Sequence, residues 1–168
     1  MTSSIQTQRG LMAFRVRGQS CALPLEWVRE IVHMALLSRP PGLPSILDGF
    51  LNLQGTTLPV LRLDRLFNLP EQSPGLYTPL VILRNPDPPL ALLVDEVNGV
   101  FSVSAEDLLP VRETDLFNGC VEAEVVLNGQ TVHLLSLERL LLEQERRRIA
   151  EFQALEQQRL GELGGSPS

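Results

Sequence analysis

The sequence predicts a mainly β protein of about eight to ten short strands, followed by one C-terminal α-helix. Turn signals recur roughly every 8–12 residues along most of the chain, a spacing typical of small barrels and sandwiches. The clearest is Asn128-Gly129, because Asn and Gly accept the positive φ angles of a type I′ hairpin turn. Residues 136–160, in contrast, contain no Gly or Pro. No helix-length pattern separates the strands, so no parallel βαβ unit is predicted.

The first part of the chain predicts a hairpin. Residues 11–17 and 20–24 lie on either side of a Gly18-Gln19 turn, and both have the composition of a strand. Pro24 favours one helical turn over residues 25–28, since proline is preorganised for the start of a helix. The β-branched residues of segment 29–34 indicate the next strand.

A second hairpin follows a segment that no regular element can include. Three prolines within residues 40–44 remove backbone donors and fix φ. Ser45 is a good N-cap, so a short helix is expected over residues 46–48. Residues 49–53 and 56–63 then flank a Gln54-Gly55 turn, which predicts two antiparallel strands.

Residues 70–78 form the best internal boundary, because the composition changes there to Pro, Gly, Ser and other polar residues. Beyond this boundary, apolar strands at 80–83 and 90–94 flank a Pro-rich turn. Asn98-Gly99 is predicted to be the turn that joins two further strands.

The two ends of the chain differ from the rest. Ser136 is a good N-cap, and apolar residues recur at helical spacing after it. A helix of roughly 20 residues is predicted, ending at Gly161. Residues 1–10 are polar and predict a disordered leader, and residues 164–168 predict a flexible tail.

The composition excludes several classes of protein. The 168 residues are 43% apolar and carry a net charge of −6, from 14 basic residues, all arginine, and 20 acidic residues. An acidic chain without a long basic run is a poor nucleic-acid binder. No apolar stretch approaches the ~18 residues of a membrane span, and the polar N-terminus lacks a signal-peptide core. We therefore expect a cytoplasmic protein with no membrane insertion and no nucleic-acid partner.

The charges are unevenly distributed along the chain. Residues 1–84 carry eight basic and five acidic side chains, whereas residues 85–136 carry one basic and nine acidic side chains. If the two halves fold separately, their opposite charges would steer end-to-end association with a partner.

No constellation of residues indicates an enzyme. His33 and His133 are isolated, and an isolated histidine is more often structural than a ligand. Cys21 and Cys120 lie outside any metal or redox spacing, so buried thiols are expected. The chain also lacks a phosphate-binding loop, a dinucleotide fingerprint and a nucleophile elbow. We expect no catalytic residue, metal site or cofactor. A small β-barrel enzyme is the less favoured alternative.

Four blocks of sequence carry a resemblance. They are Val28–Ile31, Gly49–Leu63, Leu92–Val100 and Val132–Leu141. In order and spacing they resemble the CheW family, the coupling proteins of bacterial chemosensory arrays. The family's recurrent text at these places is V-x-E-I, G-x-x-N-L-R-G-x-x-x-P-V-x-D-L, G-x-x-V-D-x-V and L-L-D-x-x-x-L-L.

The resemblance implies a fold and a function. CheW-like domains consist of two SH3-like five-stranded β-barrel subdomains that share a hydrophobic core. Here the domain would cover residues 11–142, with subdomains at roughly 11–70 and 78–136, and residues 143–168 would form a helix extension and tail. Family members are non-enzymatic adaptors that link the cytoplasmic tip of a methyl-accepting chemoreceptor, bound in a groove between the subdomains, to the regulatory domain of a CheA-type histidine kinase. This chain is expected to be such an adaptor at membrane-associated receptor arrays.

The blocks identify five candidate residues for binding the receptor or the kinase: Val28, Glu30, Asn52, Gln54 and Gly55. Gln54 stands where the family usually has arginine. Arginine is always charged and pairs bidentately with carboxylates, whereas glutamine is neutral. The alternative is therefore a specialised adaptor for pili, surface motility or a second messenger, with altered or absent receptor binding.

Several of these residues also have a structural interpretation. Val28 would belong to the core, Asn52 would support its own turn through bonds to the backbone, and Gly55 would supply turn geometry. Two further positions depart from the family text, since Arg62 and Ser136 both stand where the family usually has aspartate.

The helix after Leu137 extends past the usual family end. It either folds back on the domain or docks a partner or a second copy of the chain. The residues that would form its docking stripe are Ile149, Phe152, Leu155 and Leu160. The pattern lacks sustained heptads, so no long coiled coil is predicted.

Overall fold

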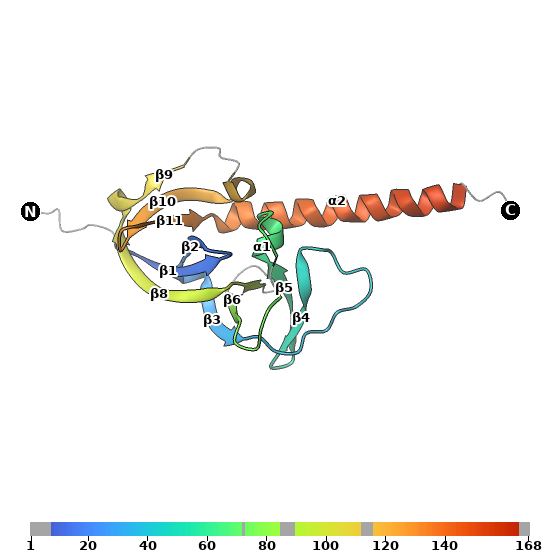
Figure 1. Cartoon of the computed structure of the whole chain (residues 1–168), viewed down its shortest axis with the longest axis horizontal. Helices are drawn as coiled ribbons and strands as arrows, with labels where there is room; N and C mark the ends of the chain where they lie inside the picture. Colours follow the sequence, from blue (N-terminus) through green and yellow to red (C-terminus); the bar gives the residue numbers. More distant parts are fainter. Residues whose placement is uncertain (1–7, 72, 85–89, 112–115, 165–168) are drawn as a thin grey trace, which may run out of the picture.

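A computed structural model shows two β-sheets joined by a common core, with a long helix along one side (Figure 1). The structure describes residues 8–71, 73–84, 90–111 and 116–164. One sheet has six strands in the order β8-β1-β2-β11-β10-β9, and the other has five in the order β3-β6-β7-β5-β4. The mainly β fold class predicted from the sequence is confirmed.

The strands and helices have the following bounds. The six-stranded sheet contains β1 (Gln8–Val16), β2 (Gln19–Pro24), β8 (Glu96–Ser104), β9 (Leu109–Pro110), β10 (Val121–Leu127) and β11 (Gln130–Leu135). The five-stranded sheet contains β3 (Val28–His33), β4 (Leu47–Leu53), β5 (Thr56–Arg62), β6 (Pro79–Leu83) and β7 (Ala91–Leu93). The helices are α1 (Leu63–Leu66), α2 (Leu137–Gly164) and the short 3₁₀ turns η2 (Leu25–Trp27), η3 (Ala105–Asp107) and η4 (Leu116–Gly119).

Three predicted hairpins are present, and each turns on two residues with positive φ. The pairs are Arg17-Gly18 (φ 50° and 81°), Gln54-Gly55 (52° and 87°) and Asn128-Gly129 (50° and 77°). This is the signature of a type I′ turn, whose twist matches that of the strands it joins. The first turn lies one residue earlier than the predicted Gly18-Gln19, because Val16 already pairs with Gln19.

Two local predictions are wrong. Asn98-Gly99 does not form a turn, because β8 includes both residues and pairs with β1 on either side of Asn98. Ala13 pairs with Gly99 and Phe14 with Val97, so Asn98 is the extra residue of a β-bulge. Ser45 does not cap a helix over 46–48, since those residues pass directly into β4.

The division into subdomains at 11–70 and 78–136 also differs from the strand pairing. β1 and β2, from the start of the chain, lie in the same sheet as β8–β11 from its second half. β2 pairs parallel with β11, and β5 pairs parallel with β7. The chain thus enters the five-stranded sheet after β2 and leaves it after β7. Such long-range pairing is decided by tertiary contacts that local sequence does not encode.

One apolar core lies between the two sheets. It includes Phe14 and Leu23 from the six-stranded sheet, Leu61 and Leu83 from the five-stranded sheet, and Leu140 from α2, all fully buried. Each sheet also has a smaller cluster of its own. The shared core that the resemblance implied is therefore present.

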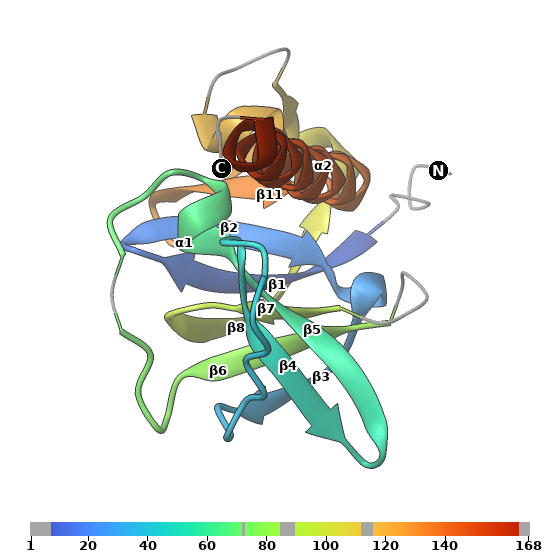
Figure 2. The same cartoon turned by 90° about the vertical axis from the view of Figure 1, so that its right-hand side faces the viewer.

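The last helix is longer than predicted. Ser136 caps it, with its hydroxyl accepting a bond from the Arg139 backbone N–H at 3.2 Å. The helix continues through the predicted stop at Gly161 to Gly164. In Figures 1 and 2 it passes beside α1. At the other end of the chain β1 already begins at Gln8, so the predicted leader 1–10 is too long, and residues 1–7 lie outside the described part.

Candidate binding surfaces on the five-stranded sheet

The β4–β5 hairpin brings three of the predicted binding residues together at its tip. Leu53 pairs with Thr56, and Gln54 and Gly55 form the exposed turn between them. The Asn52 side-chain oxygen accepts a bond from the Gly55 backbone N–H at 3.0 Å. Asn52 thus supports its own turn, which is the structural role expected for this residue type.

The tip is exposed and uncharged. Asn52, Gln54, Gly55 and Thr57 all lie on the surface, and residues 52–57 contain no ionisable side chain. A glutamine offers two donors and one acceptor, so the tip can recognise a partner through hydrogen bonds. A family-type arginine at Gln54 would add a charge that this tip lacks.

The other two predicted binding residues lie on β3, an edge strand of the same sheet. Val28 belongs to the shared core and is 9% exposed. The Glu30 side chain is 39% exposed and forms an ion pair with Arg29 at 3.4 Å. β3 and β4 occupy opposite ends of the strand order, and no described contact joins Val28 or Glu30 to the hairpin tip. The structure therefore does not bring the five residues into one cluster.

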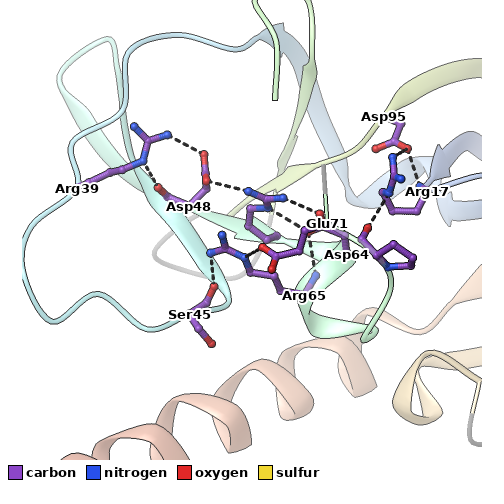
Figure 3. A network of polar contacts seen from close by, with 10 residues as sticks. Arg17, Arg39, Ser45, Asp48, Asp64, Arg65, Glu71 and Asp95 are labelled. Carbon is purple, nitrogen blue, oxygen red and sulfur yellow. Dashed lines mark hydrogen bonds and ion pairs between the residues drawn. The ribbon is translucent and has the colours of Figure 1, made fainter. Parts of the chain in front are cut away.

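A buried ionic network lies at the base of the hairpin (Figure 3). Arg62, 4% exposed, donates to Asp64 at 2.6 and 3.0 Å and to Asp48 at 3.3 Å. Arg39 contacts the Asp48 carboxylate from the other side at 3.1 Å. The hydrogen bond to Asp64, opposed by burial, raises the pKa of Arg62 above its ordinary value. The sequence analysis did not identify Asp48 as part of a site. Arg62, which stands where the family usually has aspartate, could have indicated it, because a buried arginine requires nearby carboxylates.

Gly49 explains how the segment before β4 reaches this network. A side chain at Gly49 would meet the Ser38 carbonyl oxygen at 2.8 Å and Leu37 Cβ at 2.9 Å. The close approach lets Ser38 exchange two backbone hydrogen bonds with Phe50, at 2.8 and 2.9 Å. Residues 37–39 therefore cover part of the outer edge of β4. The tip of the β4–β5 hairpin stays accessible.

A hollow of about 280 Å³ lies between the sheets. Val16 from β1 and Leu93 from β7 line it, together with the carboxylates of Asp64 and Asp95. Asp95 accepts a bond from the Arg17 backbone N–H at 2.6 Å. The hollow has room for side chains of a partner.

The described histidines and cysteines do not converge on a reactive centre. Cys21 and Cys120 are both fully buried, and burial raises the pKa of each thiol to about 12. His133 packs edge-on against Phe117 at 5.5 Å, and its Nδ1 lies 3.6 Å from the Glu124 carboxylate. Among the described residues, no group of three or more His, Cys, Asp and Glu side chains is placed to hold a metal ion. Within the same residues, no helix is long and apolar enough to cross a membrane.

The proposed docking stripe on α2 is described only at Leu155. Its side chain is 49% exposed. The side chains of Ile149, Phe152 and Leu160 lie outside the described part of the chain. Earlier in the helix Leu137 and Leu140 are buried in the shared core, so this end folds back on the domain.

Comparison with known proteins agrees with the fold and with the sequence blocks. A model of the CheW-like domain matches residues 10–145. The chemotaxis protein CheW of Bacillus subtilis (strain 168) is 31% identical over 108 residues, covering 64% of this chain and 69% of that protein. Protein FrzA of Myxococcus xanthus is 26% identical over 157 residues, covering 89% and 96%. The crystal structure of the scaffolding protein TtCheW from Thermoanaerobacter tengcongensis superimposes with a TM-score of 0.71 at 19% identity, covering 77% and 90%. The chain therefore belongs to the CheW-like domain family.

Proposed function

We propose that this protein is a non-enzymatic adaptor that couples chemoreceptors to a CheA-type histidine kinase in the cytoplasm, at membrane-associated receptor arrays. The observation that carries the proposal is the exposed Gln54-Gly55 tip, which stands at the position of the family's N-L-R-G block. Family membership over residues 10–145 supports the same role. The adaptor acts by position, holding the regulatory domain of the kinase in a geometry that receptor signals can change.

The geometry of the five-stranded sheet favours two partner surfaces. One is the hairpin tip, which we assign to the receptor. The other is the β3 edge with its half-exposed Glu30, which we assign to the kinase, since an edge strand has unpaired backbone groups that accept another chain. Val28 supports the β3 surface from the core, and Asn52 and Gly55 support the tip by fixing its turn.

Binding measurements test the coupling role directly. The regulatory domain of the kinase and a receptor tip from the same genome are titrated separately with the full chain. We expect each to bind with a dissociation constant below ~100 μM, a generous limit for transient contacts. Absence of binding to both partners up to that concentration would refute the coupling function.

The variant Gln54→Arg tests the assignment of the two surfaces. We expect it to change affinity for the receptor tip, while affinity for the kinase domain stays within twofold, about 0.4 kcal/mol. The matched control is Thr131→Arg, which adds the same charge at an exposed position of β11 on the other sheet and should leave both affinities unchanged. Equal changes in both affinities for Gln54→Arg would contradict separate surfaces.

A second candidate is a specialised adaptor for pili, surface motility or a second messenger. The uncharged Gln54 favours it, because this side chain cannot form the bidentate pair of an arginine. This candidate predicts kinase binding with weak or absent receptor binding in the native chain.

Self-association through α2 also stays a prediction. Light scattering of the full chain tests it by comparison with the variant Leu155→Glu.

A further inference from the structure

The C-terminal helix is hydrogen-bonded to β10 of the six-stranded sheet and to α1 and the loop before β4 beside the five-stranded sheet, and part of it lies beyond the region that matches the family. Its first turn is fixed to the six-stranded sheet, since the Arg139 guanidinium donates to the Val121 carbonyl of β10 at 2.9 Å. Leu137 and Leu140 anchor the same turn in the shared core. Residues 146–151 follow the end of the family match at residue 145.

This later segment, residues 146–151, is hydrogen-bonded to α1 and to the loop before β4, next to the five-stranded sheet. Arg147 donates to the Asn68 side chain at 3.0 Å and to the Leu66 carbonyl at 3.4 Å, both at the end of α1. Glu143, whose side chain is 9% exposed, accepts from Arg147 at 3.1 Å and so orients the guanidinium.

Four residues further along, Glu151 holds the loop before β4. Its carboxylate accepts the Ser45 backbone N–H at 2.8 and 3.1 Å and also the Ser45 hydroxyl. The Ser45 carbonyl in turn accepts from Arg65 at 2.7 Å, so the loop, α1 and α2 form one network. Figure 3 shows Ser45 and Arg65 on the side of the five-stranded sheet that faces the helix.

We propose that residues 146–151 form a brace that fixes the five-stranded sheet relative to the six-stranded sheet. Arg139 and Glu151 are twelve residues apart, so about 18 Å of stiff helix joins the two attachments. Hydrogen bonds at these two separated points hold the relative orientation of the sheets in addition to the packing of their common core. Because β4 follows the held loop directly, the brace also sets the position of the β4–β5 hairpin. The brace does not depend on what the hairpin binds.

Distance measurement between the sheets tests the brace. Spin labels are placed at Thr57→Cys on β5 and Thr131→Cys on β11, two exposed positions on different sheets and away from α2. The native Cys21 and Cys120 are fully buried and do not compete for the label. Double electron–electron resonance then gives the distribution of distances in the full chain.

The comparison is between Arg147→Ala/Glu151→Ala and the control Glu145→Ala, which removes an exposed charge from the same helix. We expect the control to keep one narrow peak and the double variant to lose it in favour of a broad distribution. Hydrogen exchange at the Ser45 amide should rise in the double variant alone. Far-UV circular dichroism checks that both variants stay folded. An equally narrow peak in both variants would overturn the brace.

Discussion

Arg62 shows how one substitution in a family block is accommodated. The position lies at the end of β5, where residues 60–62 are all buried, and a charged side chain there is costly unless it is paired. Asp48 and Asp64, 7% and 6% exposed, supply two carboxylates, and Arg39 supplies a second cation. The charge of Arg62 is therefore balanced by carboxylates on β4 and α1, and only folding brings Asp48 next to Arg62.

Replacing Arg62 should destabilise the protein strongly. Arg62→Leu leaves two buried carboxylates without their shared cation, and breaking such a group costs about 3–5 kcal/mol. Urea unfolding monitored by the fluorescence of Trp27 measures the loss. The matched control Arg84→Leu removes an exposed arginine of the same half and should cost far less. Equal losses for the two variants would show that the network contributes little.

At the scale of single elements, the hairpins and α2 were predicted best, because their determinants are local. A type I′ turn needs two residues that tolerate positive φ, and these are neighbours in the sequence. The bulge at Asn98-Gly99 was predicted as a turn because the same dipeptide suits both. Only the partner strand β1, which continues on both sides of Asn98, decides between them.

The acid stability of α2 should depend on Glu143. Burial raises the pKa of Glu143, but hydrogen bonds from Arg146 and Arg147 outweigh it and lower the pKa below its ordinary value of 4.5. A carboxyl whose pKa is lower in the folded state stabilises that state above pH 4.5 and loses this contribution as the pH falls through the folded-state pKa.

We therefore expect Glu143→Gln to be less stable than the native chain at pH 7. The difference in unfolding free energy should shrink below pH 4.5. Chemical unfolding at a series of pH values measures it, with the exposed Glu145→Gln as the control. A difference that stays constant between pH 7 and pH 3 would contradict the role of the Arg146 and Arg147 pairs.

At the scale of the whole molecule, the pairing of β1 and β2 with β8–β11 changes the meaning of the charge distribution. The arginines that make residues 1–84 basic include Arg9, Arg15 and Arg17, which belong with the acidic strands of the second half. Residues 25–94 hold five basic and six acidic side chains, and residues 8–24 with 95–136 hold four basic and eight acidic. The two halves of the fold therefore do not carry opposite charge, and steering by opposed ends has no basis.

The shared core predicts that the two sheets unfold together. Three aromatic rings connect the two sheets. The ring of Phe67, which follows α1, stacks on the ring of Phe117 in η4, with their centroids 4.5 Å apart. Phe117 in turn packs edge-on against His133 of β11. Phe67→Ala should cost about 3–5 kcal/mol, the usual range for a buried phenylalanine. Trp27 fluorescence, from the five-stranded half, and far-UV circular dichroism should give coincident transitions in the native chain. Separate transitions would show that the sheets fold independently.

The sequence by itself determined most of the elements and the resemblance to the family. Strand-forming segments, type I′ turns and the capped helix depend on neighbours in the chain, and the four blocks needed only order and spacing. The tertiary structure decided which strands share a sheet, that Val28 belongs to the core, and that Asp48 pairs with Arg62. These features join residues far apart in sequence, and apolar strand patterns are compatible with many pairings until a common core selects one.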